Sequence, residues 1–93
     1  MRITYDPQKR AITLAERGLD FEDTPRVFAG PTLEAPGNRR DYGEVRWQTV
    51  GWLNDRLVMV IWTERDDARR IISMRYIHAE DQDRYLVSLD RPG

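Results

Sequence analysis

The 93-residue chain contains no cysteine and a single histidine. Without cysteine it can form neither a disulfide nor a thiolate zinc site, and this fits a reducing compartment. One histidine excludes a metal site built from several histidines, although a carboxylate site remains possible. The chain also lacks an 18-residue apolar run and an apolar signal-peptide core after Met1. We therefore expect a cytoplasmic protein without membrane contact.

Net charge is almost absent as well. Fifteen basic and sixteen acidic residues leave a formal charge of −1, so the chain is not a polycation that grips nucleic acid non-specifically. Fourteen of the fifteen basic residues are nevertheless arginine, whose planar guanidinium suits bidentate contacts with phosphate or carboxylate. A local anion site is therefore compatible with the neutral balance.

With 40% apolar and 33% charged residues, the sequence is typical of one globular domain spanning residues 1–93. Its organising stretch is predicted to be an antiparallel meander of three strands between Glu44 and His78. Leu57–Trp62 is apolar at six consecutive positions, which predicts a central strand covered on both faces. Val45–Trp52 and Arg69–Ile77 are the predicted flanking strands.

Two-residue turns at Asn54-Asp55 and Asp67-Ala68 would fix the register of this meander. Glu44, Arg65 and Arg70 would then share one cross-strand row. Side chains alternate between the two faces of a strand, so the same register places other charged residues by parity. Arg46 would lie one row in on the same face, whereas Glu64 and Arg75 would share the opposite face. A solvated sheet end is the simpler interpretation of these charges. A β-bulge or the sheet end could bring the two sets together; otherwise one of them is structural.

Before the meander, Arg2–Tyr5 is predicted to be a short strand and Pro7–Arg17 a helix. Asp6 is a suitable N-cap for this helix and Gly18 a suitable C-terminal stop. Its predicted buried stripe consists of Ile12, Leu14 and Ala15, and Leu19 and Phe21 are predicted to pack the corner that follows.

A second helix is predicted within Phe21–Phe28, and it presents Val27 and Phe28 to the core. It either begins at Thr24, with Pro25 as its first residue, or places Pro25 at the limit of its first turn. The remaining segments are assigned in chain order: a loop at Pro31–Gly43, a terminal helix at Ala79–Leu86 and a frayed tail at Ser88–Gly93. The expected fold is α+β with the order β-α-α-β-β-β-α, in which helices pack against an antiparallel sheet.

Several short motifs, in this order and at these spacings, resemble one protein family. They are Tyr5-Asp6-Pro7-Gln8-Lys9, Arg17-Gly18-Leu19-Asp20-Phe21-Glu22, Val27-Phe28, Tyr42-Gly43-Glu44-Val45-Arg46-Trp47, Thr63-Glu64-Arg65, Arg70-Ile71-Ile72-Ser73-Met74-Arg75, and Glu80 with Tyr85. The family is BrnT, ribonuclease toxins of bacterial type II toxin–antitoxin systems with a RelE-like fold.

The resemblance implies cleavage of RNA without a metal or an organic cofactor. It also implies a partner, a BrnA-like ribbon–helix–helix antitoxin, in a toxin–antitoxin heterotetramer that contacts operator DNA only through the antitoxin. Three residues depart from the family pattern: Arg17 stands where the family has histidine, Glu16 where it has lysine, and Tyr76 where it usually has lysine. The departures leave a second interpretation open, a catalytically weakened homologue that acts as an antitoxin-binding module in an autorepressor complex.

Metal-free cleavage of RNA needs a base for the 2′-hydroxyl, cations for the charge that develops on phosphorus, and an acid for the leaving oxygen. We assign the cationic role to Arg65, Arg70 and Arg75, and the base to Glu44 or Glu64.

Four further residues are candidates for binding RNA: Lys9, Arg46, Arg69 and His78. For Lys9 a solvated surface position, and for His78 a surface or capping position, is the simpler interpretation. Trp47 and Trp62 are predicted to be core residues. Trp52, beside the Asn54-Asp55 turn, is predicted to be exposed and to bind the antitoxin.

Overall fold

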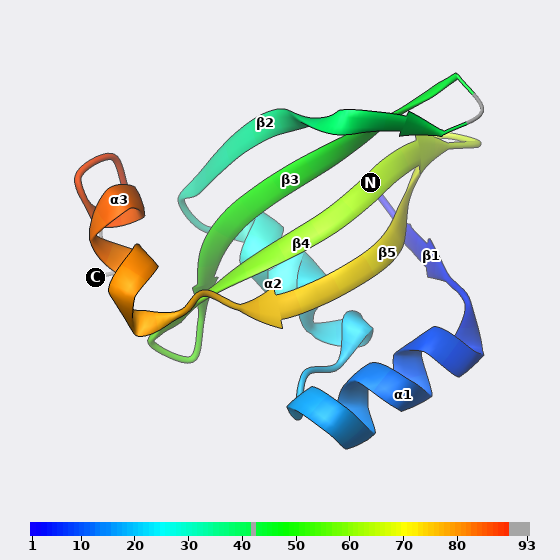
Figure 1. The fold of residues 1–93 in the computed structure, drawn as a ribbon. Helices are drawn as coiled ribbons and strands as arrows, with labels where there is room; N and C mark the ends of the chain where they lie inside the picture. Colours follow the sequence, from blue (N-terminus) through cyan, green and yellow to red (C-terminus); the bar gives the residue numbers. More distant parts are fainter. Residues whose placement is uncertain (42, 90–93) are drawn as a thin grey trace.

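The computed structural model describes residues 1–41 and 43–89, and of residues 38–41 only the backbone (Figure 1). In chain order the elements are β1 (Ile3–Tyr5), α1 (Pro7–Arg17), a 3-10 turn (Phe21–Asp23), α2 (Thr24–Ala29), β2 (Thr32–Asp41), β3 (Glu44–Leu53), β4 (Arg56–Arg65), β5 (Ala68–Tyr76), a second 3-10 turn (Ala79–Asp81) and α3 (Gln82–Leu86). The predicted α+β class is confirmed.

The sheet differs from the prediction in two respects. Its five strands have the order β1-β5-β4-β3-β2, and β1 runs parallel to β5, so the sheet is mixed rather than antiparallel. The predicted loop at Pro31–Gly43 is also wrong, because residues 32–41 form β2 and pair with β3 from Thr32 opposite Gly51 onward. Pro36 is tolerated in β2 because an edge strand can lack a ladder hydrogen bond.

The face of the sheet that α2 covers carries the larger core, and in Figure 1 α2 passes behind the central strands. Its buried members are Leu19, Phe21, Val27, Leu53, Val58, Val60, Trp62, Ile71 and Met74. Gly51 allows α2 to approach β3 closely, since a Cβ atom there would lie 2.8 Å from Val27 Cγ1. The predicted core residues of the corner and of α2 are thus confirmed, and the helix starts at Thr24, as the first of the two alternatives has it.

Within residues 1–41 and 43–89, the opposite face is covered at one end only, by the C-terminal segment. There Val50, Trp52, Leu57, Met59, Ile77 and Leu89 form a second buried cluster, with Tyr85 and Leu86 of α3 packed against it. Both faces of β4 are therefore covered over much of its length, as its apolar run predicted. Two expectations fail here. Trp52 is only 9% exposed, and Leu89, which was assigned to the frayed tail, is 5% exposed; residues 90–93 of that tail lie outside the described residues.

Helix α1 has the predicted ends. The Asp6 carboxylate accepts a hydrogen bond from the Gln8 amide at 2.9 Å, and Gly18 closes the helix with a left-handed φ of 69°. The predicted buried stripe is wrong, however: Ile12 is 55% and Leu14 43% exposed, and none of the residues of α1, all of which the structure describes, is buried. The helix instead contacts the rest of the fold through polar side chains, and it turns apolar side chains to solvent.

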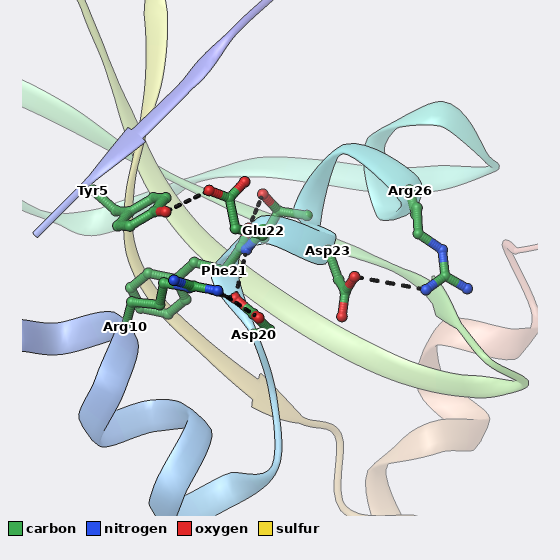
Figure 2. A network of polar contacts seen from close by, with 8 residues as sticks. Tyr5, Arg10, Asp20, Phe21, Glu22, Asp23 and Arg26 are labelled. Atoms are coloured by element: carbon green, nitrogen blue, oxygen red, sulfur yellow. Dashed lines mark hydrogen bonds and ion pairs between the residues drawn. The ribbon is translucent and has the colours of Figure 1, made fainter. Parts of the chain in front are cut away.

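A network of polar contacts holds the start of α1 to the corner before α2 (Figure 2). Arg10 forms two hydrogen bonds with Asp20, Nε to Oδ1 at 2.7 Å and Nη2 to Oδ2 at 3.0 Å. Asp20 also accepts from the Glu22 amide at 2.9 Å, and the Tyr5 hydroxyl donates to the Glu22 carboxylate. These contacts lower the pKa of the Asp20 carboxyl, chiefly through the bond from Arg10, and raise the pKa of the Tyr5 hydroxyl, chiefly through the bond to Glu22.

Replacing Asp20 by asparagine is expected to remove a contribution to stability that depends on pH. Because the folded-state pKa of Asp20 is lowered, this contribution is present above the ordinary aspartate pKa of about 4 and is lost as the pH falls through the folded-state value. Urea unfolding should therefore show the native chain more stable than Asp20→Asn at pH 7, and the difference should shrink toward pH 2. A difference that is constant over this range would contradict the assignment.

Candidate functional site

The register of the meander decides which charged residues share a face. Asn54, Asp55, Asp66 and Asp67 all have positive φ, so both connections are two-residue turns. The first lies where it was predicted, but the second is Asp66-Asp67 rather than Asp67-Ala68. Aspartate adopts the left-handed conformation that both central positions require more readily than alanine does.

The shift by one residue changes the rows. Arg65 pairs with Ala68. Arg70 pairs with Thr63, which precedes Arg65 by two residues in β4. The predicted row of Glu44, Arg65 and Arg70 is therefore wrong for Arg70, whereas Glu44 and Arg65 do contact each other. Arg70 still shares a face with Arg65, because Thr63 and Arg65 are separated by two residues on one strand.

A second irregularity brings Arg75 to this face. Ile61 pairs with Ser73 whereas Trp62 pairs with Ile71, so Ile72 is an extra residue in β5. Such a bulge reverses the alternation of side chains beyond it. Arg75 consequently pairs with Met59, on the same face as Arg70. The opposite face predicted by regular alternation is wrong for Arg75, and the alternative in which a β-bulge brings it to this face is confirmed.

Glu44 and Arg65 form a bidentate ion pair at the end of the sheet. Arg65 donates from Nε to Glu44 Oε1 at 3.0 Å and from Nη2 to Oε2 at 2.8 Å. This bonding holds the pKa of the Glu44 carboxyl below its usual value, and the charges of Arg46 and Arg70 lower it further. The same pair raises the pKa of Arg65. Glu44 is thus held ionised and occupied by its partner.

The arginine strip, as we call Arg46, Arg65, Arg70 and Arg75, runs along this face. From Thr63, opposite Arg70, to Met59, opposite Arg75, β4 advances by four residues, which is about 13 Å. Arg75 therefore stands apart from the Glu44–Arg65 pair, and its Nη2 lies 3.5 Å from the Met59 sulfur. The candidates form an extended strip rather than one pocket.

Beside Arg75, the second core leaves an apolar hollow of about 290 Å³ under α3. It is lined by Leu33, Glu34, Ala35, Gln48, Val50, Met59 and Tyr85. Met59 lines this hollow and contacts Arg75, so the hollow adjoins the strip at that residue.

Glu64 and Arg69 lie on the helix-covered face, where they pair with each other across β4 and β5. The Arg69 guanidinium carbon lies 3.9 Å from the ring centre of Phe28 and 5.0 Å from that of Trp62. Arg69 therefore packs against the core, away from the strip. Glu64 and Glu44, however, both line a hollow of about 340 Å³ at the sheet end, which Gly43, Val45, Trp47 and Thr63 complete.

Among the remaining candidates, Lys9 is exposed on α1 and His78 is exposed just after β5. His78 lines a cavity of about 350 Å³ together with Arg17, Arg75 and Tyr76. Sequence reasoning treated Arg17 and Tyr76 only as departures from a pattern. Their shared cavity depends on the docking of α1 against β5, which leaves no signal in the sequence.

The tryptophans are placed by the register. Trp47 pairs with Trp62, and their rings stack with centres 6.2 Å apart, as the predicted core position requires. The Trp62 indole N–H donates to Thr49 Oγ1 at 2.8 Å, and this hydroxyl donates to Glu34 at 3.0 Å. Trp52 belongs to the second core and not to an exposed surface.

Comparison with known families identifies the chain. A family model described as "Ribonuclease toxin, BrnT, of type II toxin-antitoxin system" matches residues 5–81, which is most of the sequence. The chain belongs to the BrnT family. It is accordingly a ribonuclease toxin of a type II toxin–antitoxin system, and the family implies an antitoxin partner. No individual curated protein matches it.

The match covers every candidate residue of this BrnT protein from Lys9 to His78, whereas Tyr85 lies beyond it. Tyr42, which opens one of the shared motifs, lies outside the described residues. Within the described ranges, no three histidine or carboxylate side chains gather in a way that could hold a metal ion. In the same ranges, no helix has the length and apolarity needed to cross a membrane.

Proposed function

We propose that this BrnT protein cleaves RNA without a metal ion and that the RNA backbone lies along the arginine strip. The observation that carries the proposal is the bulge at Ile72, which puts Arg75 on the same face as Arg46, Arg65 and Arg70. Guanidinium groups bind phosphate oxygens through paired hydrogen bonds and stabilise the charge that develops on phosphorus.

Under this proposal Glu44 positions Arg65 rather than accepting a proton. A carboxylate whose pKa is lowered below its usual range is a weak proton acceptor near neutral pH. Glu64 lines the same hollow as Glu44 but lies on the opposite face of the sheet from Arg65, so it is not placed to take a proton from an RNA that follows the strip.

The partner we propose is a BrnA-like ribbon–helix–helix antitoxin, bound in a heterotetramer that reaches operator DNA through the antitoxin. The protein would act in the cytoplasm. The exposed apolar side chains of α1, Ile12 and Leu14, support a partner on that side of the molecule.

A second candidate function is a weakened toxin that serves as the antitoxin-binding module of a repressor complex. The occupied state of Glu44 favours it, because a carboxylate held by Arg65 is not available as a base.

The first test combines growth arrest on induction with cleavage of RNA by the purified protein in the presence of a chelator. Arrest and chelator-resistant cleavage support the metal-independent enzyme. A protein that is harmless and leaves RNA intact, yet binds its antitoxin, supports the repressor module instead. Cleavage that the chelator abolishes would contradict metal independence.

Replacing Arg70 by alanine tests the strip. Loss of one phosphate contact is expected to weaken RNA binding and to reduce the slope of log affinity against log salt concentration by about 0.7. Arg26→Ala is the matched control, because Arg26 is an exposed arginine on α2 that contacts Asn54 and Asp23 instead of the strip. Equal salt slopes for the native chain, Arg70→Ala and Arg26→Ala would refute the strip.

A further inference from the structure

The cavity between the end of α1 and the edge of β5 combines four groups suited to one anion. Arg17 comes from the last turn of α1, Arg75 and Tyr76 from the end of β5, and His78 from the segment after it. Its volume is about 350 Å³, and the lining residues that the structure describes offer two guanidinium groups, a phenol and an imidazole, and no carboxylate. We call it the edge pocket.

The Arg17 side chain is held in place by the backbone of β5. Its Nη1 donates a hydrogen bond to the Met74 carbonyl at 2.9 Å, which uses one of the five N–H groups of the guanidinium. The remaining donors belong to a planar group that is already oriented, so binding an anion costs less side-chain entropy than it would with a mobile arginine.

Arg75 joins the edge pocket to the arginine strip. It lies on the strip's face, opposite Met59, and it also lines the edge pocket. A chain of phosphates that follows the strip therefore reaches the edge pocket at Arg75. Among the residues of strip and edge pocket, His78 is the one whose type exchanges protons readily near neutral pH.

We infer that the edge pocket binds the phosphodiester that is cleaved, with Arg17 and Arg75 on its oxygens and His78 as the proton donor to the leaving group. This rests on the proposed ribonuclease function and adds to it the place of cleavage. The 2′-oxygen forms a bond to phosphorus and gives its proton to water. The bond from phosphorus to the 5′-oxygen breaks, and that oxygen takes a proton from the imidazolium of His78. The products are a 2′,3′-cyclic phosphate and a 5′-hydroxyl.

The test uses the full chain and an RNA oligonucleotide that contains a mapped cleavage site. A second oligonucleotide carries sulfur in place of the 5′-bridging oxygen at that site, and a thiolate leaves without needing a proton. His78→Ala is expected to cleave the ordinary RNA about 100-fold more slowly than the native chain, which is the scale of a general acid. It is expected to cleave the sulfur-containing RNA at close to the native rate.

The Arg17→Ala variant tests the phosphate contact independently of the proton donor. It removes a phosphate contact and leaves His78 in place, so it is expected to slow cleavage of both substrates by a similar factor, and Arg17→Lys is expected to recover part of the loss. Arg84→Ala, on α3 and outside the edge pocket, is the control for removing an exposed arginine. Urea unfolding of each variant establishes that it is folded.

Two results would overturn the inference. If the native chain cuts RNA and His78→Ala cleaves the ordinary and the sulfur-containing RNA more slowly by the same factor, His78 is not the proton donor. If His78→Ala and Arg17→Ala cut RNA as the native chain does and only their binding of the antitoxin is weakened, the edge pocket belongs to the partner. A native chain that cuts no RNA would defeat the proposed function itself, which is a distinguishable outcome.

Discussion

Replacing Arg75 by alanine is expected to lower RNA cleavage by about 10²- to 10³-fold, the scale found when one preorganised donor to a developing charge is removed. Arg75 is the residue that the arginine strip and the edge pocket share, so its loss affects both the path of the backbone and the reacting phosphate. Its side chain is exposed, and the fold should survive the change. The measurement is the single-turnover rate of cleavage beside the urea-unfolding midpoint.

Arg75→Lys separates charge from geometry in the same experiment. Lysine keeps the positive charge and loses the planar fork, so an intermediate rate is expected. Native activity in a folded Arg75→Ala protein would place cleavage elsewhere, and the hollow at the sheet end that contains Glu44 and Glu64 would then be the remaining candidate.

Replacing Phe21 by alanine is expected to cost about 3–5 kcal/mol of the free energy of unfolding. Phe21 is 0% exposed, lies in the larger core and meets Tyr5 edge to face with ring centres 5.9 Å apart. Small domains have a total stability of only about 5–15 kcal/mol. The change should therefore lower the melting temperature by more than about 10 °C.

Ile12→Ala is the matched control for this truncation. The side chain of Ile12 is 55% exposed on α1, so its removal is expected to change stability by less than about 0.5 kcal/mol. The two variants together test the orientation of α1. A loss at Ile12 as large as that at Phe21 would mean that α1 packs through its apolar side after all.

The parts of the fold that the sequence predicts are those governed by local chemistry. Asp6, Pro7 and Gly18 mark the ends of α1, and the apolar run of β4 predicts its double coverage. Long-range pairing has no such local marker. The parallel contact of β1 with β5, and the extension of β2 along β3, depend on partners distant in sequence.

In the candidate site, too, the sequence predicts local features better than the pairing of distant segments. The residue types were identifiable, because arginines and a carboxylate in strands indicate anion chemistry. The sequence predicts one face for Glu44, Arg46, Arg65 and Arg70, but not the place of Arg75 beside them, which depends on the extra residue Ile72. The turn at Asp66-Asp67 moves the pairing by two positions and changes only the rows, whereas Ile72 moves every following side chain by one position and so changes its face. The burial of Trp52 likewise follows from the C-terminal segment folding back over β3 and β4.

The outward orientation of the apolar residues of α1 has a consequence for motion. A helix that buries none of its described residues, and that is held by the Arg10–Asp20 pair and the Arg17–Met74 bond, can detach while the core stays closed. Such local opening costs much less than global unfolding. Each opening would carry Arg17 away from the edge pocket, so the pocket is complete only in the docked fraction of molecules. Any contact that changes this docking equilibrium, even on the outer side of α1, would alter how often the pocket is assembled.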